Sequence, residues 1–121
     1  MNGSTRRAVA YIAGRLIREI PVSTVYDYDK GQYFSLAGDV SKRQVSVFDY
    51  DGGFHVGGSS GDGRSFSLYD YGHSSYISLE IHGNQFRGYD YASGAHFSGR
   101  VDTKAVSLYD YGKSKYFNYS V

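Results

Sequence analysis

Cysteine is absent from this 121-residue chain. No disulfide framework can form without it, and no thiol is present to act as a catalytic nucleophile. Because nothing in the composition indicates an oxidising compartment, we expect a cytoplasmic protein. At this length, residues 1–121 are expected to form one domain around one core.

Long apolar runs are missing as well. No stretch of about 18 apolar residues occurs, so no transmembrane helix is expected. Arg15, Arg18 and Glu19 interrupt the segment that would have to serve as the apolar part of a signal peptide. We therefore expect the N-terminal segment to belong to the fold, and a membrane partner is not expected.

A strong net charge is also lacking, since the formal value is +1. Such a chain has no global field that would attract nucleic acid. The charge is nevertheless uneven: residues 1–20 hold four arginines and one glutamate, a net +3, and residues 21–121 hold nine basic and eleven acidic groups, a net −2. The two parts should therefore attract each other weakly.

The N-terminal segment has the apolar period of an amphipathic helix over about residues 5–20. Ser4 or Thr5 is the expected N-cap, and Pro21 should set the end. We expect the apolar half to cover one face of a sheet and the other half to be polar. The polar half comprises Arg7, Tyr11, Gly14, Arg15, Arg18 and Glu19.

An aromatic-Asp-Tyr triplet occurs five times, at spacings of 22, 21, 20 and 20 residues. About twenty residues suffice for two short strands and two turns, so each repeat is expected to be one β-hairpin. The hairpins should occupy about residues 23–43, 44–64, 65–84, 85–104 and 105–121. The triplets are Tyr26-Asp27-Tyr28, Phe48-Asp49-Tyr50, Tyr69-Asp70-Tyr71, Tyr89-Asp90-Tyr91 and Tyr109-Asp110-Tyr111.

Each hairpin should turn through four residues, as in Asp29–Gln32, and a positive φ is expected near one shared turn position. Glycine occupies that position in three repeats and serine in two: Gly31, Gly53, Gly94, Ser74 and Ser114.

Pairing of the residues that flank each turn assigns the two faces of the sheet. The predicted core face collects Phe34, Val47, Phe66, Leu68, Ile77, Phe86, Phe97, Val106, Leu108 and Phe117. The opposite face collects the triplet aromatics with serines and with Tyr33, His55, Tyr76, His96 and Tyr116.

The last segment, residues 116–121, has no charged side chain and would make a poor exposed edge strand. It should pair with the first strand to close a barrel, or with another subunit. The predicted fold is therefore mainly β: an N-terminal amphipathic helix, then five hairpins forming a curled antiparallel meander or barrel around or against that helix.

Asp recurs at the last position of the first strand of every repeat, on the otherwise aliphatic face. An Asp just before a turn can accept hydrogen bonds from the turn amides, which explains the recurrence without chemistry. A row of carboxylates binding a cation or a sugar is the alternative. Asp27 with Asp29, and Asp49 with Asp51, faintly suggest calcium, but the other ligands of a calcium loop are not in place, and neither a metal nor a cofactor is predicted.

His55 and His96 replace tyrosine at one repeat position. In an open sheet they would stand four strands, nearly 20 Å, apart and could not share a metal ion. His73 is expected in a turn and His82 in a connection.

Residues 58–65 have the spacing of a phosphate-binding loop with Arg64 in place of the lysine. Such a loop must open a helix, whereas residues 66–69 read as a strand. We interpret this segment as a connection.

The tyrosine-rich face carries the functional prediction, because tyrosine offers a large contact area and a hydroxyl group. We expect a non-catalytic binding or interaction module that self-associates as a homo-oligomer, with a small molecule, glycan or protein as a possible partner. The candidate ligand-binding residues are Tyr28, Tyr50, Tyr71, Tyr91, Tyr111, His55 and His96.

Two alternatives remain open from the sequence. A small-molecule or glycan-binding barrel could be catalytic through His55 or His96 as a base and an Asp as its orienting group. Stacking of single-stranded nucleic acid on the aromatics is less favoured, because only Arg87 and Arg100 are basic on that face.

Overall fold

The computed structural model describes all residues, 1–121, as one helix followed by ten strands. The helix α1 spans Gly3–Arg18. The strands are β1 (Thr24–Asp27), β2 (Gln32–Val40), β3 (Gln44–Asp49), β4 (Phe54–Ser60), β5 (Ser65–Asp70), β6 (Ser75–His82), β7 (Gln85–Asp90), β8 (Ala95–Asp102), β9 (Ala105–Asp110) and β10 (Lys115–Ser120).

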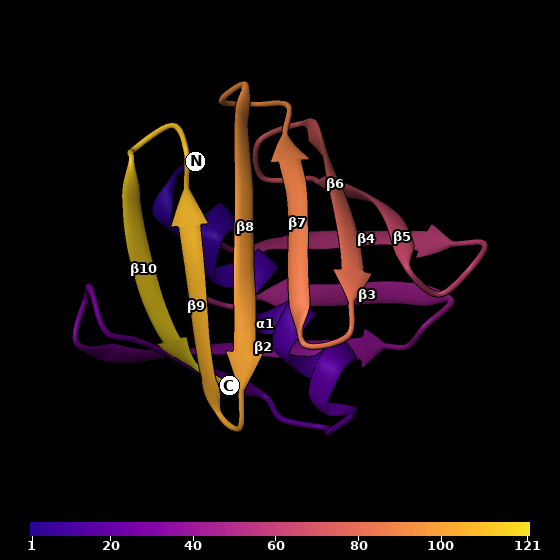
Figure 1. The fold of residues 1–121 in the computed structure, drawn as a ribbon, viewed down its shortest axis with the longest axis horizontal. Coiled ribbons are helices and arrows are strands. Elements are labelled where there is room, and N and C mark those ends of the chain that lie inside the picture. Colours follow the sequence, from indigo (N-terminus) through magenta and orange to yellow (C-terminus); the bar gives the residue numbers. More distant parts are fainter.

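The ten strands form a closed antiparallel barrel in which each strand pairs with its neighbours in sequence (Figure 1). β1 closes the ring against β10, with Tyr26 opposite Ser120 and Asp27 opposite Tyr119. The predicted pairing of the uncharged last segment with the first strand is thus confirmed. Closure leaves no strand with a side that is free along its whole length.

Helix α1 lies inside this barrel, between the strands in front of it and those behind it (Figure 1). Residues 8–13 have no exposed surface, and six consecutive residues cover every direction around a helix axis. Of the two predicted arrangements, a barrel around the helix or against it, the structure therefore has the first. The complete burial of Tyr11, which the helical period placed in the polar half, was not anticipated. A ring of ten strands is too wide to be filled by its own side chains, and the helix fills the remainder.

Residues assigned to the polar half of the helix bond to the segment that follows the helix and to strand β2. The Tyr11 hydroxyl donates to the Val22 carbonyl, and Arg15 donates to the Gly38 carbonyl at 2.7 Å. Position 14 of the helix needs a glycine, because a Cβ there would lie only 2.8 Å from a methyl group of Val121. These contacts could not be anticipated from the helical period alone.

The ends of α1 differ slightly from the prediction. The N-cap is Asn2, whose side chain accepts from the Thr5 amide at 2.8 Å, and not Ser4 or Thr5. The helix ends at Arg18 because Glu19 adopts a left-handed conformation with φ 55°. The chain therefore leaves the helix before Pro21 can terminate it.

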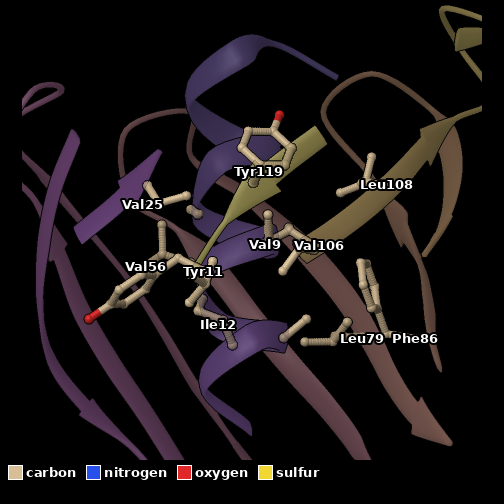
Figure 2. Close-up of a cluster of buried hydrophobic side chains, with 14 of the residues drawn as sticks. Val9, Tyr11, Ile12, Val25, Val56, Leu79, Phe86, Val106, Leu108 and Tyr119 are labelled. Atoms are coloured by element: carbon tan, nitrogen blue, oxygen red, sulfur yellow. The ribbon is translucent and has the colours of Figure 1, made fainter. Parts of the chain in front are cut away.

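The core is formed by inward side chains of the strands packed around α1, as Figure 2 shows for Val9, Ile12, Leu79, Leu108 and Tyr119. Every predicted core residue is buried, with at most 7% of its surface exposed.

The hairpin turns lie one residue earlier than predicted. The first turn is Tyr28–Gly31, so that Asp27 faces Gln32 and Tyr26 faces Tyr33. This changes the partner of Tyr33 by two residues, and a shift of two leaves each side chain on the same face. The predicted faces are thus correct, and the shared turn position has the expected positive φ in all five repeats, between 50° and 73°.

Candidate binding surface

The outer surface at the hairpin-turn end of the barrel carries five aromatic triads, one in each hairpin. In each triad the first aromatic of the triplet is the central ring, and it is half-buried. The rings on either side meet it edge-to-face, with centroids 4.7–5.0 Å apart and planes inclined by 68–77°. The triads are Tyr26/Tyr28/Tyr33, Phe48/Tyr50/His55, Tyr69/Tyr71/Tyr76, Tyr89/Tyr91/His96 and Tyr109/Tyr111/Tyr116.

The five candidate tyrosines are the final residues of the triplets, and each is 55–64% exposed. Among aromatic rings, each one contacts only the central ring of its own triad. The barrel therefore spaces them around its circumference and does not gather them into one pocket. The edge-to-face contacts restrict the rings and leave their hydroxyls in solvent.

His55 and His96 take the third place in their triads, against Phe48 and Tyr89. Both are exposed, and neither ring has a hydrogen-bond partner. They lie on β4 and β8, so the structure does not bring them together. No group of three or more His, Cys, Asp or Glu residues is placed to hold a metal ion.

Two grooves on this surface are built from equivalent residues of neighbouring hairpins. The first groove, of about 480 Å³, lies between the third and fourth hairpins; the second, of about 520 Å³, lies between the fourth and fifth. Six positions correspond in repeat register. They are Ser67, Tyr69, Tyr76, Ile77, Ser78 and Tyr91 in the first groove, and Arg87, Tyr89, His96, Phe97, Ser98 and Tyr111 in the second.

The grooves adjoin one another. Ser78 lines both the first and the second. A third groove, of about 580 Å³, shares Arg87 and Ser98 with the second and extends to Tyr116. The three together form a furrow across the outer side of β5 to β10, which we call the tyrosine furrow. Sequence reasoning identified its tyrosines but missed its continuity, which depends on which strands are neighbours.

Charges in the tyrosine furrow are paired. Arg87 Nε lies 3.3 Å from the Glu80 carboxylate, and His82 lies 3.1 Å from the same carboxylate. The hydrogen bonds from His82 and then Arg87 lower the pKa of the Glu80 carboxyl below its usual value. Arg100 pairs with Asp102 at 3.5 Å. Neither an anionic nor a cationic polymer would find a surface of uncompensated opposite charge here.

His82 is the last residue of β6 and not part of a connection as predicted.

Below the triads, the five triplet aspartates form a buried layer, each with at most 3% of its surface exposed. In every repeat Oδ1 accepts a hydrogen bond from the amide two residues later, at 2.9–3.2 Å. The predicted role of these carboxylates as acceptors for turn amides is confirmed.

The second carboxylate oxygen of most of these aspartates has a further partner that the repeat pattern did not reveal. Asp110 Oδ2 lies 3.2 Å from Arg6 and 3.2 Å from the amino group of Met1, and Asp27 Oδ2 lies 3.6 Å from Arg7. Asp70 Oδ2 accepts from the Thr5 hydroxyl at 3.0 Å. The aspartates thereby hold the first turn of α1 at this end of the barrel.

The two buried arginines also stack on inward rings. The Arg6 guanidinium lies 3.7 Å from the centre of the Phe117 ring, and the Arg7 guanidinium lies 3.7 Å from that of Phe34. These contacts compensate part of the cost of burying the charges. Asp49 Oδ2, in contrast, is buried without any hydrogen-bond partner.

His73 is a residue whose pairing the sequence did not indicate. It sits in a turn as predicted, but Nδ1 lies 2.8 Å from the buried Asp70 carboxylate. Its side chain is about one-third exposed, and its ring packs edge-on against Phe54. The spacing could have indicated this pairing, since His73 stands three residues after the triplet aspartate Asp70. No hydroxyl nucleophile hydrogen-bonds to the ring.

The glycine-rich segment around residues 58–65 comprises the end of β4, a turn and the start of β5, so only its middle is the predicted connection. Asp62 accepts from the amides of Arg64 and Ser65 at 2.9 and 2.8 Å. These bonds, that from Ser65 first, lower the pKa of the Asp62 carboxyl. The segment opens no helix.

No helix of the structure has the length and apolar character needed to cross a bilayer. Comparison of the chain with protein-family models, with curated proteins and with solved structures gave no match, so the residues of the triads, the furrow and the aspartate layer carry the functional argument alone.

Proposed function

We propose that this protein is a non-catalytic binding module that acts through its outward tyrosine face and self-associates. The observation that carries the proposal is the repetition of one groove architecture on adjacent hairpins, with equivalent residues at six positions. An enzyme needs one site with distinct catalytic groups, whereas repeated grooves suit a repeated contact.

The placement of the rings supports binding. Eight tyrosines are 55–70% exposed, and each is oriented by an edge-to-face neighbour. Tyrosine has few rotatable bonds, so a ring that is already oriented loses little conformational entropy on contact with a partner. The interior offers no comparable place, because α1 occupies it.

Native mass spectrometry and sedimentation of the purified chain test this proposal. The test variant combines Tyr71→Ser, Tyr91→Ser and Tyr111→Ser, and the control is Lys104→Ser in the exposed turn at the opposite end of the barrel. We expect the wild type and the control to retain either a dimer or a bound mass, and the triple variant to lose it. Sedimentation over a roughly hundredfold concentration range separates self-association from ligand retention.

The measurement has a clear negative outcome. If the wild type is a bare monomer throughout the range, or if the triple variant keeps its complex while its circular dichroism is unchanged, the tyrosine face is not the contact surface. The rings would then serve only to pack against one another across the strands.

A further inference from the structure

We infer that the tyrosine furrow is a binding site for an extended, uncharged glycan chain running around the barrel. This inference rests on the proposed function and names the class of ligand for the same face. It follows from the chemistry of the lining, the repeat distance, the charge and the closure of the barrel.

The lining combines aromatic rings with small hydroxyl groups. The second groove is lined by both Tyr89 and Tyr111, and the Tyr111 hydroxyl lies 3.5 Å from Ser98 Oγ. In the first groove Ser67, Ser74, Ser75 and Ser78 surround the tyrosines. A sugar ring presents an apolar C–H face and a rim of hydroxyls. The furrow offers aromatic surface for the former and hydrogen-bonding groups for the latter.

The repeat distance suits a polymer. Equivalent residues of consecutive hairpins are separated by two strands, which is about 9.6 Å at the usual strand spacing. This is comparable with the length of a disaccharide unit in an extended glycan. The furrow contains two equivalent grooves in succession, so one chain could occupy both with the same contacts.

The paired charges of the furrow favour a neutral glycan over charged extended polymers. The ionised groups of the second groove, Glu80 and Arg87, are already paired. Nucleic acids and sulfated glycans would need uncompensated cations to offset their charge.

Closure of the barrel favours a glycan over an extended peptide as the ligand. A peptide that binds a sheet in extended form adds a strand to a free edge and gains main-chain hydrogen bonds. The ten strands here close into a ring, so no strand has one side free along its whole length to accept such a peptide. A ligand that brings its own hydroxyl groups does not require such a free side.

Affinity electrophoresis in native gels tests the inference. The probes are three neutral polysaccharides, namely a soluble β-glucan, soluble amylose and galactomannan, with chondroitin sulfate and oligothymidine as charged counterparts. We expect at least one neutral polysaccharide to retard the protein, with little dependence on salt. The combined variant Tyr91→Ala and Tyr111→Ala should weaken this binding about tenfold or more, since two aromatic contacts are removed.

The chain offers a matched control for this variant. Tyr28 and Tyr50 have the same place in their triads and are each 62% exposed, but they line none of the three grooves. The combined variant Tyr28→Ala and Tyr50→Ala should therefore bind like the wild type. Equal weakening in both variants would show that the furrow is not the site.

Two further results would overturn the inference. Retardation only by the charged polymers, weakened by salt, would identify an anionic ligand. No retardation by any of the probes would remove glycans as the ligand class. If the native-mass test had still shown that a complex depends on the tyrosines, the proposed function would stand while this inference fell.

Discussion

The middle and the outer residues of each triplet are neighbours in sequence, yet they experience opposite environments. Asp110 has no exposed surface, while the adjacent Tyr111 is 55% exposed. Alternation along the strand places the aspartate inward, where it holds the turn and the helix, and the aromatic residues outward, where they form the triads. The repeated triplet therefore has two separate roles, one in holding the fold together and one in presenting a surface.

The five aspartates also differ among themselves, although the repeat makes them look equivalent. The N-terminal end of α1 is a single asymmetric element inside a ring of five hairpins, so it contacts only some of the carboxylates, each through a different residue. Asp110 meets Arg6, Asp70 meets Thr5, and Asp49 Oδ2 meets no donor. The predictions below use these differences, beginning with the largest expected effect.

Asp110→Asn should destabilise the protein most. The substitution keeps an acceptor for the turn amides but removes the charge that Arg6 faces at 3.2 Å. Breaking one side of a buried ion pair typically costs about 3–5 kcal/mol. Urea unfolding followed by circular dichroism measures the loss. The exposed Asp102→Asn is the control, and similar losses in both variants would contradict a special role for the buried layer.

At alkaline pH, the buried tyrosine hydroxyls should lower the stability of the protein, whereas the exposed ones should not. Burial, followed by the charge of Asp27, raises the pKa of Tyr119, and burial raises the pKa of Tyr11. A raised folded-state pKa stabilises the protein fully below the unfolded value of about 10, and this contribution is lost as pH rises above it.

Between the unfolded-state and the folded-state pKa of each buried tyrosine, the expected loss is about 1.4 kcal/mol per pH unit. The free energy of unfolding, measured in urea at several alkaline pH values, should therefore fall less steeply in Tyr119→Phe than in the wild type. Equal slopes would mean that the Tyr119 hydroxyl reaches solvent in the folded state.

Tyr91→Ser should have a smaller effect on stability. Its ring makes one edge-to-face contact, with Tyr89 at 4.8 Å, and is 60% exposed. Loss of one such aromatic pair costs about 0.5–1.5 kcal/mol. Urea unfolding of Tyr91→Ser, Tyr89→Ser and the double variant isolates the pair. A coupling energy near zero would show that the triads do not orient their outer rings.

Asp49→Asn should change stability least among the substitutions of the buried layer. Its Oδ1 still accepts from the amides of Asp51 and Gly52, while Oδ2 has no donor to lose. We expect a change in unfolding free energy within about 1 kcal/mol, because a buried unpaired charge is unfavourable to begin with. A loss as large as that of Asp110→Asn would show that the layer responds to total charge and not to individual pairs.

Much of this architecture could be predicted because the information is local and repeated. The triplet period of about twenty residues set the five hairpins, and the alternation within each strand identified the core from Phe34 to Phe117 as well as the tyrosine face. The turn position with positive φ was also visible, since glycine or serine recurs there. Even a two-residue error in pairing was harmless, because side-chain direction depends only on parity.

The features that sequence could not supply all arise from contacts between distant segments. The helical period of α1 indicated one apolar face, but closure of the barrel surrounded the helix and buried Arg7, Tyr11 and Gly14 as well. The partners of the five aspartates and the joining of three grooves across β5 to β10 likewise depend on which strands become neighbours. Local periodicity determined the elements and their faces. Only the closed ring decided how completely the helix is enclosed and which surfaces meet, because those outcomes follow from the shape of the whole barrel.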